Sequence, residues 1–117
     1  MSKAVPEYVP GHGLLAGKVV VVTAAAGTGI GFATAKKAQE EGATVVVSDW
    51  HERRLGEAAE QLGGVLAVPC DVTSEDAVQR LFSETVAAHG RVDVLVNNAG
   101  LGGTAALVDM ADEEWAR

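Results

Sequence analysis

The sequence predicts an α/β fold built on a doubly wound parallel sheet. From Lys18 onward, short runs of β-branched apolar residues alternate with alanine-rich stretches that have helical spacing. This alternation is typical of parallel strands joined by helices. Each apolar run is nearly continuous, as expected for strands that helices cover on both faces. Glycine or polar turns separate the runs from the stretches, so the chain consists of repeated strand, turn and helix units.

The expected elements follow one another in a regular order. Strands are predicted at Val19 to Val22, Thr44 to Ser48, Val65 to Val68 and Val92 to Val96, and helices at Gly29 to Glu41, Glu52 to Gln61 and Glu75 to Ala88. We expect all of these strands to be central in the sheet. Thr73, with Asp76 three residues later, is the candidate N-cap of the third helix. Right-handed crossovers place the strands in the order 3-2-1-4, one mononucleotide-binding half of a doubly wound sheet.

The two ends of the chain differ from this pattern. Residues 1–17 hold two of the three prolines and are interpreted as an N-terminal arm, which leaves 18–117 as part of a single domain. A fourth helix begins near Asp112, and the chain stops at Arg117. The last predicted strand would then lack its next neighbour, and an unpaired parallel edge invites aggregation. We therefore expect a truncated domain whose C-terminal half is absent.

Composition argues against several classes of protein. A chain of 117 residues with 48% hydrophobic residues suits one folded domain and not a disordered segment. The net charge of −7 argues against a nucleic-acid partner. No apolar run reaches the roughly 20 residues that span a bilayer, so no membrane anchor is expected. The single cysteine, Cys70, excludes an internal disulfide, and the histidines are too scattered for a metal site, so we expect a reducing cytoplasm.

Three glycines occupy the turn between the first strand and the first helix. Residues 23–31 are Thr-Ala-Ala-Ala-Gly-Thr-Gly-Ile-Gly. Small residues allow the backbone to approach a pyrophosphate, and the amides at a helix start favour negative charge. The strand before the turn and the amphipathic helix after it favour a nucleotide site over a tight turn without a ligand. No Lys-Ser or Lys-Thr pair follows the glycines, which argues against an ATP-binding P-loop.

Asp49 ends the second strand 18 residues after Gly31, close to the spacing of about 20 expected for a carboxylate that accepts both ribose hydroxyls. Capping of the next helix is a compatible alternative. A 2′-phosphate ~4 Å from this carboxylate would cost about 4 kcal/mol per pair of unit charges at an effective dielectric near 20. Arg53 and Arg54 would return only ~0–1 kcal/mol each, as exposed pairs do. NAD is therefore favoured over NADP.

Polar residues also follow the third and fourth strands. Asp71 and the next backbone N–H, that of Val72, are placed to read the adenine amino group and ring nitrogen, although helix capping explains Asp71 equally well. Residues 97–100, Asn-Asn-Ala-Gly, follow the fourth strand. Their amides can tie neighbouring strand ends together, and their small residues leave room for a flat sugar or ring.

Together these motifs resemble the short-chain dehydrogenase/reductase family over Leu15 to Arg117. The family's Thr-Gly-x-x-x-Gly-x-Gly turn matches Thr23 with residues 29–31, its adenine-side acid matches Asp71, and its Asn-Asn-Ala-Gly matches residues 97–100. The resemblance implies a Rossmann-type fold that binds a nicotinamide dinucleotide. The cofactor-binding residues that we predict are Ala25, Gly27, Thr28, Gly29, Ile30, Asp49, Trp50, Asp71, Val72, Asn98, Ala99 and Gly100.

The turn departs from the family pattern in two ways. The family's first glycine is replaced by alanine, either Ala24 or Ala25 depending on the alignment, and the turn is one residue longer. We therefore expect a reshaped pyrophosphate contact. The residues of the turn and residues 48–50, Ser-Asp-Trp, resemble those of actinobacterial members of the family, some of which act on steroid-like or thioester-linked ketones.

The resemblance also implies an absence. The family transfers hydride between a nicotinamide and a ketone or secondary alcohol, using a Tyr-x-x-x-Lys pair, a Ser and usually an Asn; the tyrosine, its pKa lowered by the lysine, exchanges the proton. The only tyrosine, Tyr8, has no lysine four residues later, and the family's Asn would fall beyond Arg117. We expect this chain alone to be inactive, and the full-length parent to be an enzyme and a homo-oligomer that acts on a small ketone or alcohol.

Two other functions stay open at this point. A non-catalytic dinucleotide-binding sensor would keep the fold without the chemistry. An S-adenosylmethionine methyltransferase shares the glycine-rich turn and the acid after the second strand, but the Asn-Asn-Ala-Gly segment argues against it.

Overall fold

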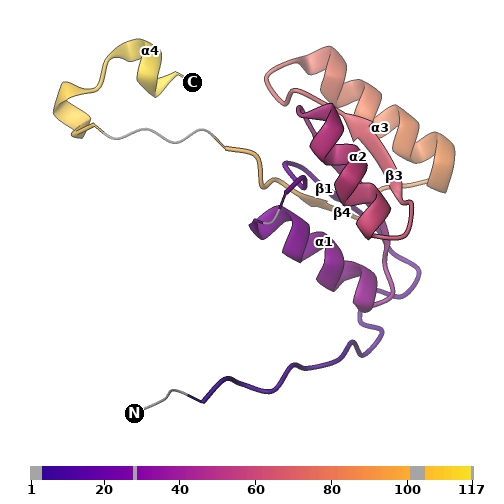
Figure 1. The fold of residues 1–117 in the computed structure, drawn as a ribbon. Helices are drawn as coiled ribbons and strands as arrows, with labels where there is room; N and C mark the ends of the chain where they lie inside the picture. Colours follow the sequence, from indigo (N-terminus) through magenta and orange to yellow (C-terminus); the bar gives the residue numbers. More distant parts are fainter. Residues whose placement is uncertain (1–3, 28, 101–104, 117) are drawn as a thin grey trace.

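A parallel sheet forms the centre of the protein in the computed structural model, which describes residues 4–27, 29–100 and 105–116. The strand order is β3-β2-β1-β4 (Figure 1). In chain order the elements are β1 (Val19–Val22), α1 (Ile30–Glu40), β2 (Thr44–Asp49), α2 (Glu52–Gln61), β3 (Leu66–Pro69), α3 (Glu75–His89), β4 (Val94–Val96), the 3-10 helix η1 (Leu107–Asp109) and α4 (Asp112–Trp115). The predicted strand order is confirmed.

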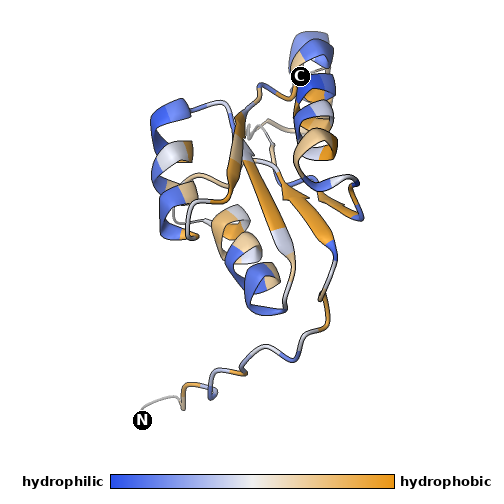
Figure 2. Ribbon diagram, turned by 90° about the vertical axis from the view of Figure 1, so that its right-hand side faces the viewer, coloured by the Kyte–Doolittle hydropathy of each residue, from blue (hydrophilic) through white to orange (hydrophobic). Residues whose placement is uncertain are grey.

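Hydrophobic cores lie on both faces of the sheet, because alternate side chains of a strand point to opposite sides. On one face Val20 and Val47 pack with Ala35 of α1 and Leu55 of α2. On the other face the core includes Val21, Val46, Val68 and Leu81, the last from α3. Figure 2 shows the same division, with orange strands at the centre and blue stretches along the helices. None of the described helices has the length and apolar character needed to cross a membrane.

The prediction that every strand is central is wrong for two of them. Among the described strands, β3 and β4 are the edges of the sheet, and β4 pairs only with β1. Val94 and Leu95 of β4 are 37% and 39% exposed. A continuous apolar run indicates a strand that is covered on its faces, but it carries no signal about whether a neighbour lies beside it.

The start of α3 also differs from expectation. Its N-cap is Ser74, whose Oγ accepts from Ala77 N at 3.3 Å. The predicted cap, Thr73, instead donates its backbone N–H and its hydroxyl to Asp71 Oδ1, at 2.9 and 2.7 Å. Ser and Thr are both good caps, and Asp71, two residues earlier, engages Thr73, so the cap lies one residue later than predicted, while the helix itself begins at Glu75 as predicted.

The start of α1 packs against the β1–α1 turn and the segment that follows β4. A Cβ atom added to Gly31 would lie 2.5 Å from Ala24 O and 2.5 Å from Asn98 Nδ2. Asn98 Nδ2 itself donates to Ala24 O at 3.2 Å. Glycine therefore allows three segments to meet without a side chain between them.

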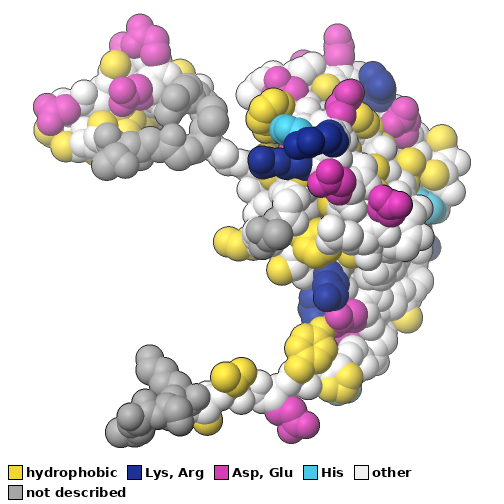
Figure 3. Space-filling model, viewed as in Figure 1, with side chains coloured by type: hydrophobic (Ala, Val, Ile, Leu, Met, Phe, Trp, Pro, Cys, Tyr) yellow, Lys and Arg dark blue, Asp and Glu magenta, His cyan; other side chains and the backbone are white. Residues whose placement is uncertain are grey.

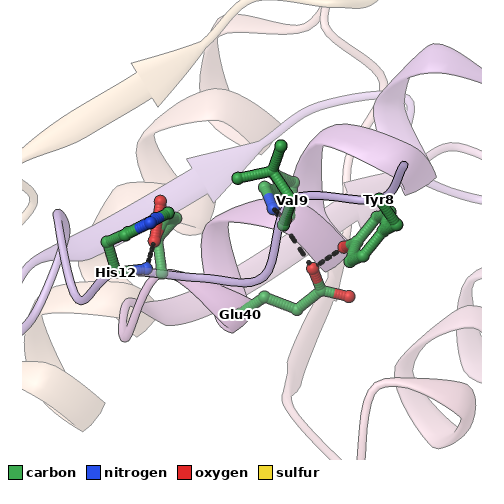
Figure 4. A network of polar contacts seen from close by, with 6 residues as sticks. Tyr8, Val9, His12 and Glu40 are labelled. Atoms are coloured by element: carbon green, nitrogen blue, oxygen red, sulfur yellow. Dashed lines mark hydrogen bonds and ion pairs between the residues drawn. The ribbon is translucent and has the colours of Figure 1, made fainter. Parts of the chain in front are cut away.

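The N-terminal arm lies against the opposite, C-terminal end of α1 (Figure 4). The Tyr8 hydroxyl donates to Glu40, and the Lys37 ammonium lies 4.7 Å from the centroid of the Tyr8 ring. The backbone N–H of His12 donates to the Glu41 carboxylate, which holds the pKa of Glu41 below its ordinary value. These contacts hold residues 8–12 against the end of α1, although the described residues 4–12 have no regular structure.

A carboxylate joins β1 to the segment before β4. Val19 N donates to Asp93 Oδ2 at 2.7 Å, and Arg91 Nε donates to the same oxygen at 2.9 Å. The Val19 amide, and after it Arg91, hold the pKa of Asp93 below its ordinary value of 3.8. The charged form of this side chain therefore supports the pairing of β4 with the sheet.

We predict that Gly31→Ala destabilises the protein by roughly 1–3 kcal/mol, because the added methyl group overpacks the contact with Ala24 and Asn98. The measurement is the free energy of unfolding in denaturant. Gly56→Ala is the matched control, since no described atom lies within 4 Å of its added Cβ in the middle of α2. It should stabilise the protein by roughly 0.5–1 kcal/mol. Equal effects of the two changes would contradict the packing explanation.

We also predict a pH dependence for Asp93. Because its pKa is lower in the folded protein, its contribution to stability is present above the unfolded value and is lost as pH falls through the folded value. The stability difference between wild type and Asp93→Ala should therefore be larger at neutral pH than at a pH well below 3.8. Chemical unfolding at the two pH values measures it, and a difference that stays constant would show that the charge is not involved.

Candidate functional site

A cleft of about 500 Å³ opens at the carboxyl ends of the strands. Its volume falls in the range of roughly 300–1,000 Å³ that is usual for small-molecule sites. In open α/β sheets, ligands bind at this edge, where the order of the strands reverses. The lining residues lie at the ends of the four strands or just after them and are Ala24, Asp49, Trp50, Cys70, Asp71, Val72, Thr73, Ala99 and Gly100.

The β1–α1 turn forms one wall of this region. Ala24 has a φ of 51°, in the left-handed region that favours glycine. Ala25, in contrast, is fully buried in the core and donates its N–H to Ser48 O at 3.0 Å. Of the two alanines, Ala24 therefore has the glycine-like conformation.

The amides at the start of α1 lie beyond this turn. Gly29 is the N-cap and has an extended backbone, and no acidic side chain occurs in the first turn of the helix. Because glycine has no side chain to cap the helix, the first amides keep their capacity for an anion. Gly27 and Ile30 are exposed beside them, whereas Thr28 lies outside the described residues.

Asp49 stands at the edge of the cleft with its carboxylate held from two sides. Oδ2 accepts from Ala26 N at 3.2 Å and Oδ1 accepts from His51 N at 3.0 Å. The N-cap of α2 is His51, whose ring accepts from Arg54 N. Asp49 therefore does not cap this helix, and its orientation is set by the β1–α1 turn and the β2–α2 turn together.

Asp71 lines the cleft after β3. Thr73 donates twice to its Oδ1, and these hydrogen bonds hold the pKa of Asp71 below its ordinary value. Ser74 caps α3, so the capping alternative for Asp71 is not the observed arrangement. Beside it, burial raises the pKa of the Cys70 thiol. Val72 lies next to Asp71 and is 47% exposed.

A cluster of hydrogen bonds around the Thr23 hydroxyl holds the ends of β1 and β4 together at the cleft. The Thr23 hydroxyl accepts from Asn98 N at 3.0 Å and from Ala99 N at 3.1 Å, and lies 3.3 Å from Val96 O, to which it donates. Thr23 was not among the predicted site residues, and neither was Gly31. Both belong to the glycine-rich motif, so the motif itself held the signal for them.

Six of the predicted cofactor residues line the cleft. These are Asp49, Trp50, Asp71, Val72, Ala99 and Gly100. Asn98 does not line the cleft, but its side-chain amide donates to the carbonyl of Ala24, which does. The side chain of Ala25 points into the core. Gly27, Gly29 and Ile30 lie at the start of α1, outside the lining of the cleft.

Charges of both signs surround the site. Dark-blue and cyan side chains gather over the start of α2 in Figure 3, next to magenta ones on the same helix. Arg53 and Arg54 are exposed there. Within the described ranges, no group of three His, Cys, Asp or Glu side chains is arranged to hold a metal ion.

Comparison with known proteins agrees with this geometry. The family model for short chain dehydrogenases matches residues 18–117. The chain is similar to a (5R,7aS)-5-hydroxy-7a-methyl-1-oxo-2,3,5,6,7,7a-hexahydro-1H-indene-carboxyl-CoA reductase of Mycobacterium tuberculosis, with 62% identity over 96% of this chain and 45% of the relative.

Two solved structures are also similar. A short chain dehydrogenase from Mycobacterium smegmatis has a TM-score of 0.88 and 62% identity, over 97% of this chain and 48% of that one. The L-sorbose reductase of Gluconobacter frateurii, solved with NADPH and L-sorbose, has a TM-score of 0.77 and 38% identity over 86% of this chain and 40% of its own. The chain thus spans less than half the length of these relatives. On its sequence match and its fold, it belongs to the short-chain dehydrogenase family, of which it contains the N-terminal half.

Proposed function

We propose that the full-length protein transfers hydride between a nicotinamide dinucleotide and a ketone or secondary alcohol, and that this chain supplies the part that binds the dinucleotide. The observation that carries the proposal is the cleft at the carboxyl ends of the strands, which two oriented carboxylates line. One of them, Asp49, is hydrogen-bonded to the turn that leads into α1, a helix whose start has no side-chain cap. Family membership supports the reaction class.

The residues of this chain fit the adenosine and pyrophosphate portions of such a cofactor. Asp49 would accept the ribose hydroxyls, since its carboxylate is already fixed at the cleft edge by two backbone donors. Asp71 and the backbone N–H of Val72 would bind the adenine edge. The amides around Gly29 would bind the pyrophosphate with the help of the helix dipole. Trp50 and Val72 are exposed apolar side chains on the same cleft, suited to the faces of a planar base.

The cluster of hydrogen bonds around the Thr23 hydroxyl would shape the floor of the site. The Thr23 hydroxyl fixes the backbone of Asn98 and Ala99. Ala99 and Gly100 line the cleft with almost no side-chain volume. A flat sugar or ring therefore has room above them. When bound, the cofactor supplies the hydride acceptor or donor. The residues that handle the proton belong to the family's Ser, Tyr-x-x-x-Lys and Asn, which we expect beyond Arg117, so we expect this chain alone to be inactive.

NAD is the preferred cofactor in this proposal. The Asp49 carboxylate would lie beside the 2′-phosphate of NADP, and the two negative charges would repel each other. Arg53 and Arg54 are exposed on α2 and are screened by solvent, so they offset little of this repulsion. A 38% identical relative was solved with NADPH, and titration of this protein with both cofactors tests the preference.

The substrate that we propose is a thioester-linked, steroid-like ketone. The support is 62% identity to a reductase whose name specifies a CoA-linked, hydroxylated indene with a ketone.

We also propose that the full-length protein is a cytoplasmic homo-oligomer. Oxidation of reduced nicotinamide by a bicyclic ketone CoA thioester tests the reaction, and absence of turnover together with retained dinucleotide binding would favour the sensor alternative.

We predict that Asp49→Ala in the full-length protein weakens NAD binding roughly 10- to 100-fold, because a charged acceptor of two hydroxyl donors is lost. NADP affinity should stay within about threefold or improve, since repulsion of the 2′-phosphate is removed together with the ribose contact. Isothermal titration with both cofactors measures this. Glu57→Ala, an exposed carboxylate farther along α2, is the charge control. Equal losses for NAD and NADP would remove Asp49 from the ribose.

We predict that Gly29→Val weakens NAD binding by at least tenfold, because a β-branched side chain fills the space where the pyrophosphate would approach the helix start. No described atom lies within 4 Å of a Cβ at this position and its φ is −89°, so the fold should tolerate the change with a loss near 1 kcal/mol. Thermal unfolding and NAD titration on the same sample separate the two effects. Unchanged affinity would show that the turn is not the pyrophosphate site.

A further inference from the structure

The turn between β2 and α2 places three consecutive side chains at the mouth of the cleft. Asp49 and Trp50 line it, and His51 follows them as the N-cap of α2. The backbone N–H of His51 donates to Asp49 Oδ1 at 3.0 Å, and its backbone carbonyl accepts from Leu55 N at 2.9 Å. One residue thus connects the carboxylate at the cleft to the first turn of the helix.

The His51 ring makes two further contacts. Nδ1 accepts from Arg54 N at 3.3 Å, so the ring caps the helix. The centroids of the His51 and Trp50 rings lie 5.7 Å apart with an interplanar angle of 66°, an edge-to-face arrangement. Serine, aspartate and asparagine are the usual N-caps. Any of them would make the first contact, but none of them would make the second.

Trp50 needs such a support. Its side chain is 75% exposed although it lines the cleft. An exposed indole without a neighbour samples several rotamers, and a ligand that requires one of them must restrict the others at a cost in entropy. An aromatic neighbour that touches the ring before the ligand arrives removes part of that cost.

We propose that His51 is a positioning residue of the dinucleotide site: its ring holds the Trp50 indole at the cleft mouth in a conformation ready to receive the adenine, while its backbone amide and Nδ1 fix Asp49 and the start of α2. This inference rests on the proposed dinucleotide function. It assigns two separate roles to the His51 side chain: the contact of its ring with Trp50 promotes dinucleotide binding, and its Nδ1 stabilises the start of α2.

Two substitutions separate these roles. His51→Asn keeps a side-chain acceptor for the Arg54 amide but removes the ring. His51→Phe keeps a ring beside Trp50 but removes the acceptor. Both are made in the full-length protein and compared by NAD titration and thermal unfolding.

The expected results are opposite for the two variants. His51→Asn should weaken NAD binding roughly three- to tenfold, the size of an aromatic pair contact, and leave the unfolding midpoint within about 1 °C. His51→Phe should lower the midpoint by about 2–4 °C and keep NAD affinity within about twofold. In a Trp50→Ala background, His51→Asn should cause no further loss of affinity. Unchanged NAD affinity in His51→Asn, or an equal loss with and without Trp50, would overturn the proposal.

A spectroscopic readout tests the positioning itself without a ligand. In fluorotryptophan-labelled protein, the fluorine NMR signal of Trp50, assigned with Trp50→Phe, should shift and sharpen in His51→Asn while the signal of Trp115 stays in place. A Trp50 signal that is insensitive to His51→Asn would also overturn the inference. If the wild-type protein binds no NAD at all, the proposed function fails, and the fluorine signal still decides whether His51 restrains Trp50.

Discussion

The close approach of α1 to the ends of β1 and β4 is the constraint on which the rest of the site depends. It exists because Gly31 has no side chain and because the Thr23 hydroxyl and the Asn98 amide hold the two strand ends in register. A larger residue at position 31 would move the helix start away from the sheet. The amides of that helix start and the cleft floor at Ala99 are therefore set by the same packing contact, and neither can move without the other.

Backbone amides, more than charged side chains, are the groups placed to interact with negative charge at this site. With a net charge of −7, the chain has no general attraction for an anion such as a pyrophosphate. The start of α1, which has no side-chain cap, would provide that attraction locally. The same backbone supplies donors to Asp49 from Ala26 and His51, which satisfies part of the carboxylate while it faces the cleft. In the proposed function, selectivity between cofactors would depend on one oriented negative charge and not on the sum of surface charges.

Much of the fold could be predicted from periodicity, because alternation of apolar runs with alanine-rich stretches and right-handed crossovers leave few topologies open. The bounds of α2 were predicted to the residue. Periodicity carries no information about neighbouring strands, so the apolar run of β3 gave no sign of its edge position, whereas the missing neighbour of β4 was expected. The caps were missed at His51 and Ser74 because neighbouring residues compete for the same amides and the outcome depends on geometry. The left-handed Ala24 was visible only as an ambiguity between two alanines, which the buried Ala25 resolves.

The contacts of the arm with the far end of α1 bear on how the protein can be handled. Tyr8 and His12 bind near Glu40 and Glu41, at the end of the helix opposite the turn that faces the cleft, and the arm leads away from the sheet (Figure 1). A fluorescent label attached to the described part of the arm, near residue 4, would thus lie at a distance from the cleft. Attachment through this arm would leave the cleft open to solution, which suits the arm for surface-based ligand screening.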